Sequence, residues 1–172
     1  MASFNLNEND YFNYSGNTDT TVTGSLGSDY ISVSLNEGAN LTVDAGDGDD
    51  LVYLNASATY TGGEYIYDYF DYTGHYTPRI YEGGDITVTG GTGNDFICFD
   101  PSANITITGS AGMDTFKPLD SNLEQDHRAV ITEFTTGANG DNVDLSQIMV
   151  TLGFLDNVNA QDAFDQGIFS LV

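Results

Sequence analysis

A short sequence unit recurs along the chain, and this repetition limits the folds that the chain can adopt. Each copy has Thr and a β-branched residue, then a small, glycine-containing stretch, an aspartate and, two residues later, an apolar residue. An eroded copy, FNLNENDYFNY, occupies residues 4–14. Repeats of this kind indicate a solenoid, in which each unit stacks on its neighbours. The four clear copies are TVTGSLGSDYISV (21–33), TVDAGDGDDLVYL (42–54), TVTGGTGNDFICF (87–99) and TITGSAGMDTFKP (106–118).

The repeat aspartates are almost evenly spaced. Those at positions 10, 29, 50, 95 and 114 are separated by 19, 21, 45 and 19 residues. The long interval equals two units, or one unit with an insertion. Each unit has room for two short strands and two turns, so we expect an all-β parallel β-roll or β-helix of about five rungs.

Alternation of side chains along a strand predicts which repeat residues face inward. In Thr-Val-Thr the valine faces inward and the threonines face outward, and the second strand buries Ile31/Val33, Val52/Leu54 and Ile97/Phe99. The outward threonines resemble the ladders of ice-binding solenoids, a remote alternative, although threonine is also simply a good strand residue. The outward pairs are Thr21/Thr23, Thr42/Asp44, Thr87/Thr89 and Thr106/Thr108.

The stretch GGTGNDFIC at residues 90–98 resembles the RTX nonapeptide repeat, Gly-Gly-x-Gly-x-Asp-x-apolar-x. The other copies hold small residues in place of one early glycine. The resemblance implies a calcium-binding parallel β-roll. Typical RTX rolls have calcium turns along both edges, whereas this chain has one such turn per rung. We therefore expect a single row of about three to four calcium ions.

Candidate calcium ligands are the aspartate carboxylates and the backbone carbonyls of the stacked turns, because calcium prefers hard oxygen donors. Without a cation the aspartate column would repel itself, and Asp47 and Asp49 would add to that repulsion. The candidate set is Asp10, Gly24, Leu26, Gly27, Asp29, Ala45, Asp47, Gly48, Asp50, Gly90, Thr92, Gly93, Asp95, Gly109, Ala111, Gly112 and Asp114.

Charge restricts the partners of the chain. It has 26 acidic and three basic residues, a formal net charge of −23. Such a chain repels nucleic acids and anionic membranes. Its apolar runs are too short for a membrane span, and no classical signal peptide is expected. The single cysteine, Cys98, excludes an intrachain disulfide framework.

Two segments depart from the repeat. We assign residues 1–119 to the roll, with a tyrosine-rich insertion at 55–85, and residues 120–172 to a C-terminal cap. ITEF (131–134) and DNVDLS (141–146) resemble the terminal region of RTX proteins. That resemblance implies a type I secretion signal and a bacterial protein that is secreted or displayed on the cell surface.

Two groups of apolar residues are candidate partner-binding surfaces. In the insertion, Tyr65, Tyr67 and Tyr69 alternate along a strand, and Gly74 and Pro78 punctuate a hairpin. These tyrosines either pack on the roll or form a contact surface. The residue after each aspartate is expected to face outward, and large apolar side chains on an outward face need a partner or a cover. This outward column is Tyr11, Tyr30, Leu51, Phe96 and Thr115, with Tyr53 and Cys98 beside it.

The sequence does not favour an enzyme. His75 and His127 lie in no HExxH or triad setting, no GxSxG elbow exists, and no GK[ST] follows the glycines of GGTGND. Nothing cationic is expected near Cys98 to activate its thiol. We expect a non-enzymatic, secreted, calcium-binding structural protein that self-assembles into a filament, sheet or surface layer. The alternative is a calcium-dependent adhesion module whose tyrosine-rich insertion binds a glycan or a cell-surface or matrix component.

Overall fold

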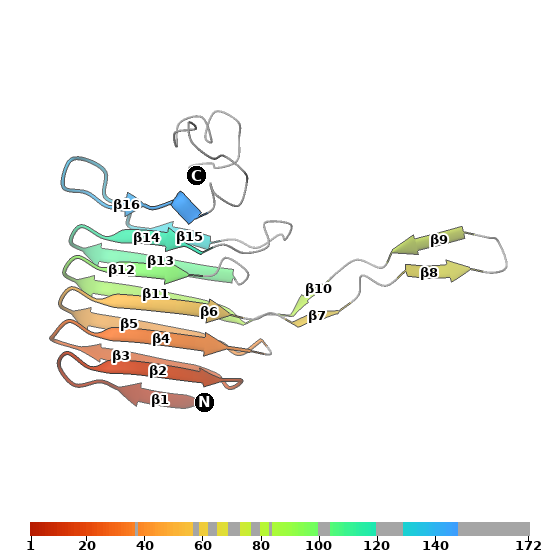
Figure 1. The fold of residues 1–172 in the computed structure, drawn as a ribbon, viewed down its shortest axis with the longest axis horizontal. Coiled ribbons are helices and arrows are strands. Elements are labelled where there is room, and N and C mark those ends of the chain that lie inside the picture. The colour runs from red at the N-terminus through yellow and green to blue at the C-terminus, as the bar shows by residue number, and fades with distance from the viewer. Residues whose placement is uncertain are drawn as a thin grey trace.

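The computed structural model is a β-solenoid built from two parallel six-stranded sheets (Figure 1). Successive strands alternate between the sheets, so each pair of strands forms one rung on top of the last. This confirms the predicted all-β parallel roll. The structure describes residues 1–36, 38–56, 59–61, 65–68, 73–76, 80–82, 84–99, 104–119 and 129–147.

Each sheet contains one strand from every rung. The first sheet consists of β1 (Ala2–Asn5), β3 (Thr20–Ser25), β5 (Leu41–Asp47), β11 (Asp85–Thr92), β13 (Asn104–Ala111) and β15 (Ala129–Thr132). The second consists of β2 (Tyr11–Gly16), β4 (Tyr30–Leu35), β6 (Leu51–Ala56), β12 (Phe96–Phe99), β14 (Thr115–Pro118) and β16 (Asn142–Val143). Both sheets therefore continue beyond residue 119.

The long interval between repeats is one unit with an insertion. Strand β5 pairs directly with β11, and β6 pairs with β12, so the chain returns to the next rung after leaving the solenoid. Within the insertion, β7 (Thr59–Thr61) pairs with β10 (Ile80–Glu82), and β8 (Tyr65–Asp68) pairs with β9 (Thr73–Tyr76), both antiparallel.

The predicted turn of the hairpin is misplaced. Gly74 lies inside β9, opposite Tyr67, and the strands connect between Asp68 and Thr73. A glycine signals a turn only where the backbone needs its freedom, and a short two-stranded ribbon also tolerates it. Pro78 and Tyr69 lie outside the described residues, as do the side chains of Tyr65 and Tyr67.

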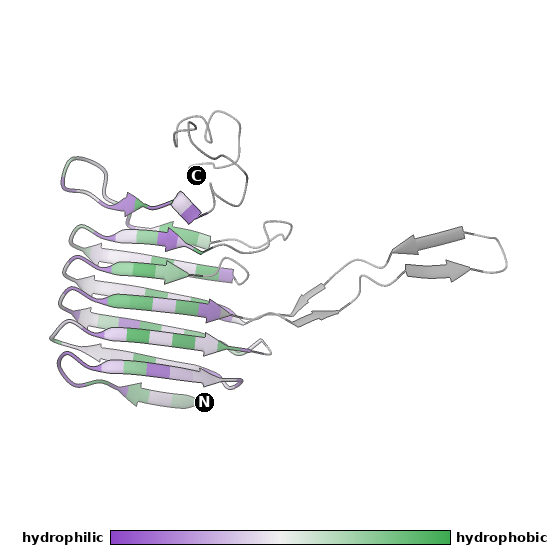
Figure 2. Cartoon of the chain, in the orientation of Figure 1, coloured by the Kyte–Doolittle hydropathy of each residue, from purple (hydrophilic) through white to green (hydrophobic). Residues whose placement is uncertain are grey.

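Inward-facing apolar side chains fill the space between the two sheets. Val22, Val43 and Val88 of the first sheet are at most 1% exposed, as are Ile31 and Ile97 of the second. All the inward pairs predicted from the repeat are buried. Apolar and polar residues alternate along the strands because the pleat turns successive side chains to opposite faces (Figure 2).

Aromatic rings close the N-terminal end of this core. The ring of Phe4 lies 4.9 Å from that of Phe12 and 5.0 Å from that of Tyr14, and Leu6 also packs against the core. The eroded first copy thus keeps the fold of a rung while it covers the apolar interior of the next one.

Candidate metal centre

The repeat aspartates form a column along one edge of the solenoid, at the turns drawn on the left of Figure 1. In each rung after the first, the Oδ1 atom accepts a hydrogen bond from the main-chain amide of the aspartate one rung earlier, at 2.7–3.0 Å. The predicted alignment of the first five aspartates is confirmed, whereas their role as ligands stays a prediction. In order, the column is Asp10, Asp29, Asp50, Asp95, Asp114 and Asp141.

Asp141 was not among the aspartates predicted to form this column. Its Oδ1 accepts the amide hydrogen of Asp114, and its Oδ2 accepts that of Thr135. The stretch before it lacks the repeat's Gly-x-Asp spacing, which hid the match. The signal was still present, because an apolar residue, Val143, follows two positions later as in every other copy.

Three column members carry a buried oxygen atom without a hydrogen-bond partner. These are the Oδ2 atoms of Asp50, Asp95 and Asp114, whose residues are 2%, 2% and 0% exposed. Buried polar atoms in folded proteins almost always have a partner, because an unpaired one costs about 1–3 kcal/mol, and more when it is charged. Each of these oxygens therefore needs a proton or a cation.

The turns around these oxygens share an unusual backbone. In the turns that lead to Asp50, Asp95 and Asp114, φ is positive both four and two residues before the aspartate. The Cβ that Gly90 lacks would collide with Asp95 Oδ2 and would lie 2.7 Å from the carbonyl oxygen of Gly109. A carboxylate oxygen and a carbonyl oxygen of the next rung thus face the same small space.

The remaining candidate ligands lie near the ends of four strands of the first sheet and in the turns that follow them. The carbonyl groups of Thr92 and Ala111 accept amide hydrogens from Gly48 and Gly93 at 2.7 and 2.9 Å, which ties neighbouring turns together. A carbonyl oxygen has a second lone pair and can still face a cation. The side chain of Asp47 lies on the exposed rim and accepts the hydroxyl hydrogen of Thr92 at 2.7 Å.

The chemistry of these donors fits a hard cation. Across the described part of the chain, no three His, Cys, Asp or Glu side chains converge as a metal site. An ion here would therefore depend on one carboxylate oxygen per turn together with backbone carbonyls and water. Calcium accepts such all-oxygen sets, whereas zinc sites in proteins are built mainly from nitrogen and sulfur ligands.

Burial perturbs the acidity of these carboxylates. It raises the pKa of Asp50 from 3.8 to about 7 and that of Asp95 to about 6, outweighing the amide hydrogen bond that each accepts. Burial likewise raises the pKa of Asp114. Neighbouring carboxylates push all three in the same direction.

These pKa values predict how the stability of the metal-free protein depends on pH. The folded state holds protons that the unfolded chain has already released above about pH 4, so its stability falls as the pH rises towards 7. We expect the melting temperature without calcium to fall as the pH rises from 5 towards 7. The Asp50→Asn variant, which cannot ionise there, should show a smaller fall. A melting temperature that is constant or rises over this range would contradict the assignment.

The outward column beside the aspartates forms a stripe of large side chains. Cross-strand pairing aligns Tyr11, Tyr30, Leu51, Phe96 and Thr115 on successive strands. The rings of Tyr11 and Tyr30 are stacked, with centroids 4.5 Å apart and planes within 5°. Tyr11 is 72% exposed and Phe96 is 36% exposed. The predicted column therefore exists on the surface of the second sheet, and its partner stays a prediction.

Cys98 departs from the prediction in two ways. It is 2% exposed although its position was expected to face outward beside Tyr53. Its strand neighbour on the other side is Lys117, whose ammonium binds Asp144 Oδ2 at 2.8 Å. A cation is thus near Cys98, contrary to expectation. Burial nevertheless prevails and raises the pKa of the thiol to about 11, which leaves it unreactive.

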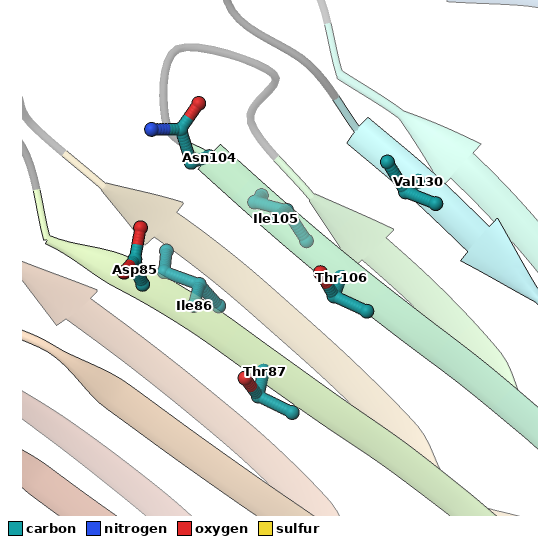
Figure 3. A pocket seen from close by; sticks show the side chains of 7 residues that line it. All are labelled: Asp85, Ile86, Thr87, Asn104, Ile105, Thr106 and Val130. Carbon is teal, nitrogen blue, oxygen red and sulfur yellow. The ribbon is translucent and has the colours of Figure 1, made fainter.

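The outer face of the first sheet carries the predicted threonine array. Thr21, Thr42, Thr87 and Thr106 are aligned across four strands. Figure 3 shows Thr87 and Thr106 side by side, with Asp85 and Asn104 at the starts of their strands. They line an open depression of about 460 Å³. Val130 follows Thr106 at the end of this row. In the parallel row that begins at Thr23, Asp44 takes the place of a threonine.

Comparisons with protein-family models, curated proteins and solved structures found no match to this chain. Among the described residues no helix has the length and apolar character needed to cross a membrane.

Proposed function

We propose that the protein is a calcium-binding structural solenoid whose ions hold the aspartate edge together. The observation that carries this proposal is the set of three buried, unpartnered Oδ2 atoms of Asp50, Asp95 and Asp114. A divalent ion at each turn would supply the missing partner and favour the ionised carboxylate. Asp50, Asp95 and Asp114 would hold the ions, with carbonyls of the stacked turns as further ligands.

Net charge supports a link between calcium and folding. A chain with a formal charge of −23 repels itself, and bound divalent cations reduce that repulsion. The RTX resemblance of the repeats and of residues 131–146 extends the proposal to type I secretion. In this scheme the chain is exported unfolded at low calcium and folds outside the cell, where calcium is more concentrated.

We further propose a non-enzymatic role based on self-assembly. The stripe of Tyr11, Tyr30, Leu51 and Phe96 is rich in aromatic side chains and partly exposed, features that are typical of protein contact surfaces. A second copy of the chain is a suitable occupant, because the stripe carries no charged side chain to be desolvated by contact.

Sedimentation velocity against calcium concentration tests both parts of this proposal. We expect the first additions of calcium to make the monomer more compact. Higher calcium concentrations should then produce larger species. Tyr30→Ser with Phe96→Ser should keep the compaction and lose the larger species. Compact monomers at all calcium concentrations would contradict self-assembly, and a glycan-array signal from them would favour the adhesion alternative. A sedimentation coefficient that does not change with calcium concentration would contradict the whole proposal.

A further inference from the structure

Asp29 differs from its neighbours in the column although it is equally buried. It is 3% exposed, and its Oδ1 accepts the amide hydrogen of Asp10 as the pattern requires. Its Oδ2, in contrast, accepts two hydrogen bonds, from the amide and from the hydroxyl of Ser25, both at 2.9 Å. Asp29 thus has protein donors on both oxygens and needs no cation.

Backbone conformation, not residue type, makes this difference. Ser25 and Ser110 occupy the same place, four residues before Asp29 and Asp114. Ser110 has a φ of +75°, and the Oδ2 atom of Asp114 is unpartnered. Ser25 does not have a positive φ, so both its amide and its hydroxyl are directed at the carboxylate.

The ends of the column follow the same rule. At the N-terminal end, Asp10 Oδ2 accepts hydrogen bonds from the amide and side chain of Asn7 at 2.8 and 3.3 Å. At the C-terminal end, Asp141 Oδ2 accepts the amide hydrogen of Thr135 at 2.7 Å. At the ends of the column the Oδ2 atoms accept hydrogen bonds from the protein, whereas in the middle they have no hydrogen-bond partner.

We propose that Ser25 takes the place of a cation at Asp29, so that calcium binds only at the central turns of Asp50, Asp95 and Asp114. This inference rests on the proposed calcium function. It gives the row of ions a defined beginning at Asp50, the first column member whose Oδ2 atom has no protein donor. The amide and hydroxyl of Ser25 supply the hydrogen bonds that the buried carboxylate of Asp29 needs, and so take the part that an ion plays in the central turns.

Counting bound calcium by native mass spectrometry of the full chain tests this inference. Asp29→Asn should bind as many calcium ions as the unmodified protein, whereas Asp95→Asn should bind at least one fewer. An equal loss in both variants would overturn the inference and leave the calcium function standing. An unmodified protein that binds no calcium would overturn both.

A second pair of variants tests the same inference if Asp29→Asn does not fold. Ser25→Gly removes the hydroxyl donor and permits the positive φ of the central turns, so it should bind one calcium ion more than the unmodified protein. Ser110→Gly is the matched control and should leave the count unchanged. A count for Ser25→Gly equal to that of the unmodified protein would overturn the assignment of Ser25.

Discussion

Removal of calcium at neutral pH is expected to unfold most of the solenoid. Without ions, three buried carboxylates must either bind protons or remain ionised beside one another, in a chain of charge −23. Ligand binding to the folded state stabilises it by about 2.7 kcal/mol per site when free calcium is about 100 times the dissociation constant. Three such sites approach the entire stability of a typical domain, about 5–15 kcal/mol.

Far-ultraviolet circular dichroism with a chelator, followed by calcium titration, measures this effect. We expect the β-sheet signal to be lost with chelator and to return with calcium. Magnesium at equal concentration should restore little of it, because magnesium requires a strict octahedral set of close ligands and keeps its water. A β-sheet signal and a melting temperature that are the same with chelator and with calcium would contradict the calcium-dependent fold.

The second large effect is expected at a glycine where two turns touch. Gly91 has a φ of +111°, and a Cβ at this position would collide with the carbonyl oxygen of Gly46 in the rung below. Gly91→Ala therefore combines backbone strain with a backbone clash that no side-chain rotation relieves. We expect a loss of more than about 4 kcal/mol in the free energy of unfolding, measured by chemical denaturation in calcium.

Gly137→Ala is the matched control for this substitution. Gly137 stands four residues before Asp141, as Gly91 stands before Asp95, and has a φ of +125° with no atom within 4 Å of a built Cβ. Only the strain of positive φ remains there, so about 1–3 kcal/mol is expected. Equal losses in the two variants would show that turn stacking does not limit the fold.

The sequence predicted the parallel roll and its core because both follow from local periodicity. Val22 is buried and Thr23 is exposed since neighbouring side chains leave a strand on opposite faces. The same alternation placed Tyr11 and Tyr30 on one surface. The column of Asp29, Asp50 and their neighbours followed from the spacing of the repeats alone.

Features that depend on contacts between distant residues could not be predicted in this way. The cation near Cys98 comes from Lys117 in the next rung, and Asp144 pairs with that lysine. The different hydrogen bonding of Asp29 and Asp114 depends on the φ of Ser25 and of Ser110, which the identical residue type conceals. Asp141 joined the column through a loop whose length departs from the repeat.

An anomalous difference map from crystals grown in calcium would show directly whether calcium occupies the aspartate edge. We expect a row of calcium peaks along the turn edge, each within about 2.3–2.6 Å of the Oδ2 atom of Asp50, Asp95 or Asp114. A map without peaks at this edge, with the three carboxylates in the same buried positions, would show that protons and not cations complete them.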